Sequence, residues 1–181
     1  MIKRGSCCAR HGALLSFLML IGIAATALCV DDASARMLPE PTGKVILTIS
    51  GKLSHHNGKG EVRLDRAMLQ QIGMHELKTR SYASTKSSIW RGVLMRDLLA
   101  YVGAKGTEIE AIALDNYRMT IPRDDFDKYD VILAMENDGK QLSVRTRGPT
   151  RLIYPYDQYE ELRTHDSGMR LVWQLSRMVV R

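Results

Sequence analysis

Two arginines, Arg147 and Arg151, flank a Gly-Pro pair in the C-terminal third of the chain. A bend at that pair would point both guanidinium groups to one side, where they can bind a ring carbonyl, a hydroxylated chain or a phosphate. Arg145 precedes the bend and is expected to be exposed to solvent. The alternative is that all three arginines belong to a basic surface loop.

Asp115 follows one stretch with strand character, and Tyr117 lies near the start of the next. A carboxylate at the end of a strand can accept hydrogen bonds from the donor edge of a flat heterocycle, and Asp115 is the best candidate for this role. Strand alternation would place Tyr117, two residues later, on the same face. The alternatives are that Asp115 bonds only the backbone of its own turn and that Tyr117 is a half-buried strand residue.

Three aromatic residues bear on whether the chain offers a flat surface for such a ring. Trp90 is predicted at the junction between a loop and a helix, where it can either stack on a ligand or pack in the core. Tyr82 is a second stacking candidate. Trp173 lies among apolar residues of a predicted terminal strand, and we expect it to belong to the core.

The sequence has three cysteines, all within the first 29 residues. If that segment is removed, no thiolate remains to act as a nucleophile or as a metal ligand. His55, His56 and His75 do not have the spacing of a metal site, and we expect no bound metal there.

Residues 1–35 have the pattern of a secretory signal. Basic residues at positions 3, 4 and 10 precede an apolar run at 13–30, and small residues follow at 33–35. The alternative is an uncleaved N-terminal anchor, because 18 apolar residues nearly span a bilayer. Cleavage would leave residues 36–181 as a single periplasmic domain, with no transmembrane span in the mature form and enough length to bury a core.

The chain carries a formal net charge of +6, with both signs mixed along its length. This balance suits an anionic small molecule or a membrane surface, and it does not call for nucleic acid. The acidic residues Asp157, Glu160 and Glu161 are expected to form a solvated face.

The hydrophobic pattern predicts an α+β domain with mixed or antiparallel sheets and a few short helices. Residues 137–139, Asn-Asp-Gly, predict a tight turn, and the stretches 108–114 and 116–122 are close enough to pair as a hairpin. We predict strands at 44–50, 75–82, 108–114, 116–122, 131–135, 151–154 and 170–180, and helices at 63–72, 95–102 and, opened by two aspartates, at 124–125.

Five motifs in this order and spacing resemble the molybdopterin-binding domain of the sulfite oxidase family, over residues 44–180. The resemblance implies a sulfite-oxidase-like fold. The motifs are Arg-Gly-Val-Leu at 91–94 with Leu-Leu at 98–99 and glycine at 103, Asp-Asn-Tyr at 115–117 with Thr-Ile-Pro at 120–122, Leu-Ala-Met-Glu-Asn-Asp-Gly at 133–139, Arg-Gly-Pro-Thr-Arg-Leu-Ile-Tyr-Pro at 147–155, and Trp173.

The chain departs from that family at one position that matters for chemistry. Catalytic members hold molybdenum with a cysteine that follows an early strand, whereas residues 76–83 contain no cysteine. The resemblance places Thr79 or Ser81 there, and a neutral hydroxyl is a poor substitute for a soft thiolate ligand. The chain therefore resembles the small, exported, cysteine-free relatives, which are regarded as pterin-binding proteins; some of them are periplasmic partners of membrane receptors that control cyclic di-GMP.

The resemblance implies a non-catalytic protein that binds a reduced or hydroxylated pterin, without molybdenum, and reports its occupancy to the periplasmic domain of a membrane receptor. Two alternatives stay open: an oxidoreductase that binds full molybdopterin without a cysteine ligand, and a protein-interaction domain that has lost its ligand. The residues predicted to bind the cofactor are Thr79, Ser81, Tyr82, Trp90, Asp115, Tyr117, Arg147 and Arg151.

Overall fold

The computed structural model describes residues 36–82 and 84–181. The predicted signal sequence and its cleavage site at 1–35 lie outside the described residues. Within the described part of the chain, no helix is long and apolar enough to cross a membrane.

The first of two five-stranded sheets has the order β4-β2-β12-β7-β8. The C-terminal strand β12 lies at its centre, parallel to β2 and antiparallel to β7, so this sheet is mixed. The predicted hairpin of β7 and β8 is confirmed. The strands are β2 (Val45–Gly51), β4 (Glu61–Asp65), β7 (Glu108–Ala113), β8 (Arg118–Pro122) and β12 (Leu175–Val180).

The second five-stranded sheet is antiparallel throughout, with the order β10-β9-β6-β5 and with β11 paired to β9. The predicted tight turn joins β9 to β10, with Asp138 and Gly139 both at positive φ. The strands are β5 (His75–Arg80), β6 (Ser87–Leu94), β9 (Ile132–Asn137), β10 (Lys140–Gln141) and β11 (Arg151–Ile153). A separate parallel pair is formed by β1 (Arg36–Met37) and β3 (His55–His56).

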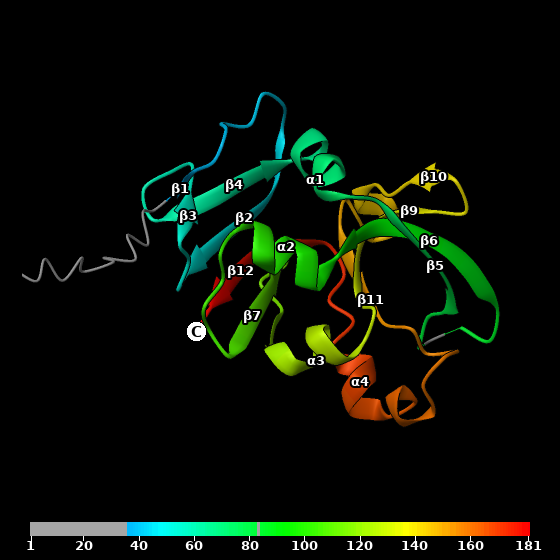
Figure 1. The fold of residues 1–181 in the computed structure, drawn as a ribbon. Helices are drawn as coiled ribbons and strands as arrows, with labels where there is room; N and C mark the ends of the chain where they lie inside the picture. Colours follow the sequence, from blue (N-terminus) through cyan, green and yellow to red (C-terminus); the bar gives the residue numbers. More distant parts are fainter. Residues whose placement is uncertain (1–35, 83) are drawn as a thin grey trace, which may run out of the picture. The chain divides into compact units, whose positions relative to one another are not determined.

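The helices in the described residues are short, and Figure 1 shows α3 and α4 at the lower edge of the sheets in that view. The predicted α+β class, with mixed and antiparallel sheets, is confirmed. The helices are α1 (Arg66–Ile72), α2 (Met95–Tyr101), α3 (Arg123–Lys128) and α4 (His165–Met169), with 3-10 turns η1 (Val144–Thr146) and η2 (Glu160–Leu162).

Both faces of the second sheet are covered by apolar side chains. The face on which a residue lies therefore determines which apolar cluster it contacts. Along β11, Leu152 faces the main core that both sheets share, whereas Ile153 faces a smaller cluster with Trp90. Because side chains alternate along a strand, Arg151 lies on the same face as Ile153. A guanidinium group is thus directed onto the smaller apolar cluster.

Three predictions differ most clearly from the structure. The helix predicted at 63–72 begins only at Arg66, because the buried Asp65 ends β4 and caps the helix by accepting a hydrogen bond from the amide of Met68 (2.9 Å). Trp90 lies inside strand β6, not at a loop-to-helix junction. The strand predicted at 170–180 begins only at Leu175.

The glycine of the Arg-Gly-Val-Leu motif has a packing role in this sheet. Gly92 lies at a register shift between β6 and β9, and a Cβ atom there would clash with the backbone carbonyl of Leu133. Only glycine permits this close approach of the two strands.

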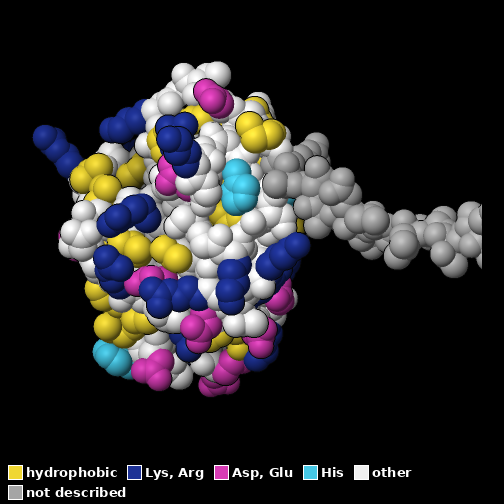
Figure 2. Space-filling view, turned by 90° about the vertical axis from the view of Figure 1, so that its left-hand side faces the viewer, with side chains coloured by type: hydrophobic (Ala, Val, Ile, Leu, Met, Phe, Trp, Pro, Cys, Tyr) yellow, Lys and Arg dark blue, Asp and Glu magenta, His cyan; other side chains and the backbone are white. Residues whose placement is uncertain are grey.

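Lys and Arg side chains are spread across one face of the molecule, with Asp and Glu gathered mainly in its lower part in the view of Figure 2. This distribution agrees with the net charge of +6. A positive surface favours approach of anionic molecules over cationic ones.

Candidate functional site

A cavity of about 360 Å³ lies where the turn between β7 and β8 meets α4 and the segment that precedes β12. This volume is in the range of small-molecule sites. Its lining includes Asp115, Tyr117, Gly168, Met169, Trp173 and Gln174.

Asp115 and Tyr117 both line this cavity, but the reason differs from the predicted one. They belong to the turn that precedes β8, where Asn116 has a φ of 67°, so strand alternation does not relate them. One carboxylate oxygen of Asp115 accepts a hydrogen bond from the amide of Tyr117 (3.0 Å), and the Tyr117 hydroxyl donates to the carbonyl of Met169 (3.0 Å). The turn is therefore fixed to α4, while the second oxygen of Asp115 makes no hydrogen bond with a described residue.

The prediction that Trp173 belongs to the core is wrong. Its side chain is 40% exposed and lines the cavity. The following residue, Gln174, is at positive φ (51°); its carbonyl accepts from the amide of Leu114 (3.0 Å), and its own amide donates to the carbonyl of Arg147 (3.0 Å). These two bonds hold the segment outside the sheet, so the indole faces the cavity instead of the interior.

The predicted convergence of Arg147 and Arg151 is confirmed, and both approach Trp173. The guanidinium carbon of Arg147 lies 3.9 Å from the centre of the Trp173 ring, and that of Arg151 lies 5.8 Å from it. Such contacts attract a cation to the face of the ring. Arg145 is exposed on η1, as predicted.

Arg151 is 4% exposed and lies between two indole rings, with its guanidinium carbon 4.8 Å from the centre of Trp90. Its Nε and one terminal nitrogen are buried and have no hydrogen-bond partner among the described residues. Burial, together with the nearby positive charge of Arg147, lowers the pKa of Arg151 to about 10, so the group is still charged at neutral pH. A buried cation with unsatisfied donors is unfavourable unless an acceptor binds it.

Trp90 packs against the guanidinium group of Arg151. Its ring is 6% exposed, packs in the smaller apolar cluster, and donates from Nε1 to the carbonyl of Thr79 (3.1 Å). It does not line the cavity, so the predicted stacking of Trp90 on a ligand is wrong in this structure. Trp173 and Tyr117 are exposed aromatic residues that do line the cavity.

Thr79, Ser81 and Tyr82 have three different environments. Thr79 is fully buried, and its hydroxyl donates to the carbonyl of Arg80 (3.3 Å) and accepts from the amide of Asp157 (3.2 Å). Ser81 is half-buried and does not line the cavity. Tyr82 packs against Gly168 of the cavity wall.

The histidines do not converge on a metal site. Within residues 36–82 and 84–181, no group of three or more His, Cys, Asp or Glu side chains is arranged to hold a metal ion. His55 bonds the carbonyl of Tyr101 (2.7 Å) through Nδ1, and His75 lies 3.5 Å from Asp97 on the surface.

The family model described as the oxidoreductase molybdopterin binding domain matches residues 61–158. The chain belongs to this family. Among solved structures, the sulfane dehydrogenase SoxCD from Paracoccus pantotrophus aligns with a TM-score of 0.54 and 18% sequence identity, over 74% of this chain and 37% of that chain. The match shows that the fold is sulfite-oxidase-like, and this chain spans just over a third of the length of that relative. No curated protein matches the sequence.

The residues present fit the pterin part of the family's cofactor. Arg151 has buried donors without an acceptor in the described part of the chain, and it lies close to Trp173, a partly exposed ring that lines the cavity. The fit to a metal is poor at the position that the resemblance gives to the ligand cysteine. Thr79 and Ser81, the two residues that the resemblance gives for that position, both offer neutral hydroxyls, and that of Thr79 is buried and bonded to backbone. Both are unlike the soft anionic ligand that the family uses.

Proposed function

We propose that this domain binds a pterin in the cavity between Asp115 and Trp173. The observation that supports this proposal best is the guanidinium group of Arg151, which is buried close to Trp173 of that cavity and has two nitrogens without a hydrogen-bond partner among the described residues. A pterin carbonyl or an anionic substituent would satisfy it by a charge-assisted hydrogen bond. The free oxygen of Asp115 would accept from the guanidine-like edge of the same ring.

The proposal is tested with the purified chain and a panel of oxidised, reduced and hydroxylated pterins. Released ligand is measured by fluorescence after acid treatment, and uptake is measured by titration. We expect the protein to carry a pterin or to take one up from the panel with saturation at one equivalent. A protein that carries no pterin and binds none from the panel contradicts the proposal.

We further propose that the domain binds the pterin without using molybdenum for catalysis. Thr79 fits poorly as a metal ligand, because its hydroxyl already donates one hydrogen bond and accepts another. The family match supports the alternative of a molybdopterin-dependent oxidoreductase. Metal analysis of protein produced with a full supply of cofactor distinguishes them: we expect much less than one molybdenum per chain, and a stoichiometric amount favours the oxidoreductase.

The domain would act as an exported reporter that presents its occupancy to the periplasmic part of a membrane receptor, such as one that controls cyclic di-GMP. Leu114 and Val144 have exposed apolar side chains next to the cavity, and their backbones are hydrogen-bonded to Gln174 of its wall: the Leu114 amide donates to the Gln174 carbonyl, and the Gln174 side-chain amide donates to the Val144 carbonyl. A ligand that orders this wall would change the surface offered to a partner. In cells, cyclic di-GMP should respond to pterin supply with the original chain and not with an Arg151→Met variant.

Asp115→Asn is expected to weaken pterin binding by about 1.5–3 kcal/mol, the usual contribution of a hydrogen bond to a charged group. The amide oxygen can still cap the turn by accepting from Tyr117, so the fold should be preserved. Titration of the variant with the best pterin of the panel measures the effect. Unchanged affinity would remove Asp115 from the binding site.

A further inference from the structure

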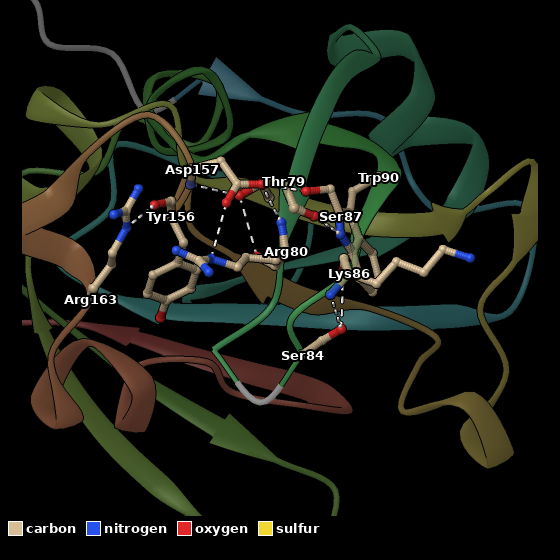
Figure 3. A network of polar contacts seen from close by, with 9 residues as sticks. All are labelled: Thr79, Arg80, Ser84, Lys86, Ser87, Trp90, Tyr156, Asp157 and Arg163. Carbon is tan, nitrogen blue, oxygen red and sulfur yellow. Dashed lines mark hydrogen bonds and ion pairs between the residues drawn. The ribbon is translucent and has the colours of Figure 1, made fainter.

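The acidic residue Asp157 was predicted to lie on a solvated face, and it is exposed in the structure, but its carboxylate also has protein partners. Its carboxylate accepts hydrogen bonds from the Ser87 hydroxyl (2.6 Å) and from the amide of Arg80 (2.9 Å), and it forms an ion pair with Nε of Arg80 at 3.1 Å. Figure 3 shows these contacts converging on the end of the β5–β6 hairpin. They lower the pKa of Asp157, with the Ser87 bond as the largest cause.

The two partners of Asp157 are the last paired residues of that hairpin. Arg80 ends β5, Ser87 begins β6, and the two face each other in the ladder. The carboxylate therefore fixes both strands at the base of the connection that carries Tyr82. The amide of Asp157 also donates to the buried Thr79 hydroxyl (3.2 Å), so its own position is defined by the same strand.

Tyr156, the residue before Asp157, contacts α4, which contributes to the cavity wall. Tyr156 is buried, and its hydroxyl donates to the carbonyl of Ser167 in α4 (2.8 Å). Its carbonyl accepts from Nε of Arg163 (3.1 Å). Residues 156 and 157 thus join the hairpin to α4, although the two elements are far apart in sequence.

Tyr82 is the side chain that this connection brings to the cavity. A Cβ atom on Gly168 would lie 2.7–2.9 Å from three carbons of the Tyr82 ring, so the ring rests directly on the backbone of a residue that lines the cavity. Tyr82 also lines a second pocket of about 410 Å³, together with Arg80 and Arg163. The residue thus contacts Gly168 of the first cavity and contributes to the wall of the second.

We propose that Asp157 is a positioning residue for the ligand cavity, because it holds the β5–β6 hairpin so that the Tyr82 ring closes the cavity wall on Gly168. It does not touch the ligand itself; it acts through Tyr82. The expected effect of Asp157 on ligand binding rests on the proposed pterin site, whereas its effect on the position of the hairpin does not.

The first test needs no ligand. Amide hydrogen exchange is compared in the full chain, in Asp157→Asn, and in Asp130→Asn as a matched control, since Asp130 pairs with Arg96 (2.6 Å) on the surface and lines neither hollow. We expect exchange at the hairpin end, including the amides of Arg80 and Ser87, to be at least about tenfold faster in Asp157→Asn and unchanged in the control. Equal exchange in all three proteins would overturn the proposal.

The second test asks whether Asp157 acts through Tyr82, by a double-mutant cycle on pterin affinity. Asp157→Asn and Tyr82→Ala are each expected to weaken binding about tenfold, and the double variant is expected to bind no worse than Tyr82→Ala alone. Gly168→Ala, which displaces the ring from the other side, should reproduce the loss. Additive losses, or wild-type affinity in Asp157→Asn, would show that Asp157 does not act through this ring.

The two tests separate this inference from the proposed function. If no pterin binds the original chain, the proposed function fails, and the exchange experiment alone decides the role of Asp157. If pterin binds and the exchange of the hairpin does not respond to Asp157→Asn, the positioning role fails and the proposed function stands.

Discussion

Arg151→Met is expected to lower pterin affinity at least about 100-fold while leaving the ligand-free protein as stable as the original or more stable. The loss is expected because two buried donors of Arg151 have no acceptor within residues 36–82 and 84–181, and the ligand would supply one. Hydrogen bonds to a charged group contribute about 1.5–3 kcal/mol each, and two of them account for a loss of this size.

Arg151→Met is expected to lower affinity without lowering the stability of the ligand-free protein, for a physical reason. Replacing a buried, unpaired cation by an apolar side chain of similar length removes its desolvation cost and keeps the contact with Trp90. Most substitutions of a buried residue destabilise a protein, so a gain in stability with a loss of binding identifies a group held in place for a ligand.

Titration and denaturant unfolding of the ligand-free protein measure the two effects of Arg151→Met. Arg145→Met is the matched control, because that arginine is exposed on η1 near the same bend, and we expect both quantities to stay close to the original. A destabilised Arg151→Met protein that still binds pterin would mean that Arg151 has a structural role only.

Trp173→Ala is expected to weaken pterin binding about 10- to 100-fold. Stacking of a flat heterocycle on an aromatic side chain contributes about 1–3 kcal/mol, and the exposed Trp173 is the indole that lines the cavity. The variant also removes the ring over which Arg147 lies at 3.9 Å. The guanidinium groups would then be less well oriented toward the ligand.

Trp173→Phe is the conservative comparison for this prediction. It keeps an aromatic face and should recover most of the affinity, whereas Trp173→Ala should not. Because the side chain is 40% exposed, the free energy of unfolding should change far less than for a core tryptophan, for which about 3–5 kcal/mol is usual. A large loss of stability without a change in affinity would instead assign Trp173 to the core.

Local patterns in the sequence were sufficient for much of the fold. The Asn-Asp-Gly turn, the hairpin of β7 and β8 and the helix α2 all follow from signals within a few residues of one another. The bend between Arg147 and Arg151 also accounts for the approach of both side chains to the same side. The helix α1 was predicted too early because Asp65 serves both as a strand end and as a cap, and apolar spacing alone does not distinguish these roles.

The candidate site was predicted only in part, since its residues come from segments that the sequence does not relate. Asp157 bonds Ser87 and Arg80, which precede it by 70 and 77 residues. In the sequence Asp157 is close to Glu160 and Glu161, and this local pattern does not indicate such distant partners. Trp173 was present in the motif set, yet apolar neighbours indicated the core. Its exposure depends on the bonds of Gln174 to Arg147 and Leu114.

The sequence by itself determined the α+β class, the family resemblance, the absence of cysteine after residue 29 and the candidate roles of Asp115, Arg147 and Arg151. These properties depend on residue types and on short spacings, which the sequence states directly. Only the tertiary structure decided that Arg151 is buried without an acceptor among the described residues, that Trp173 faces a cavity and Trp90 does not, and that residues 156 and 157 join the hairpin to α4. Burial and partnership depend on which distant strands and loops meet, so they are set by packing and not by local order along the chain.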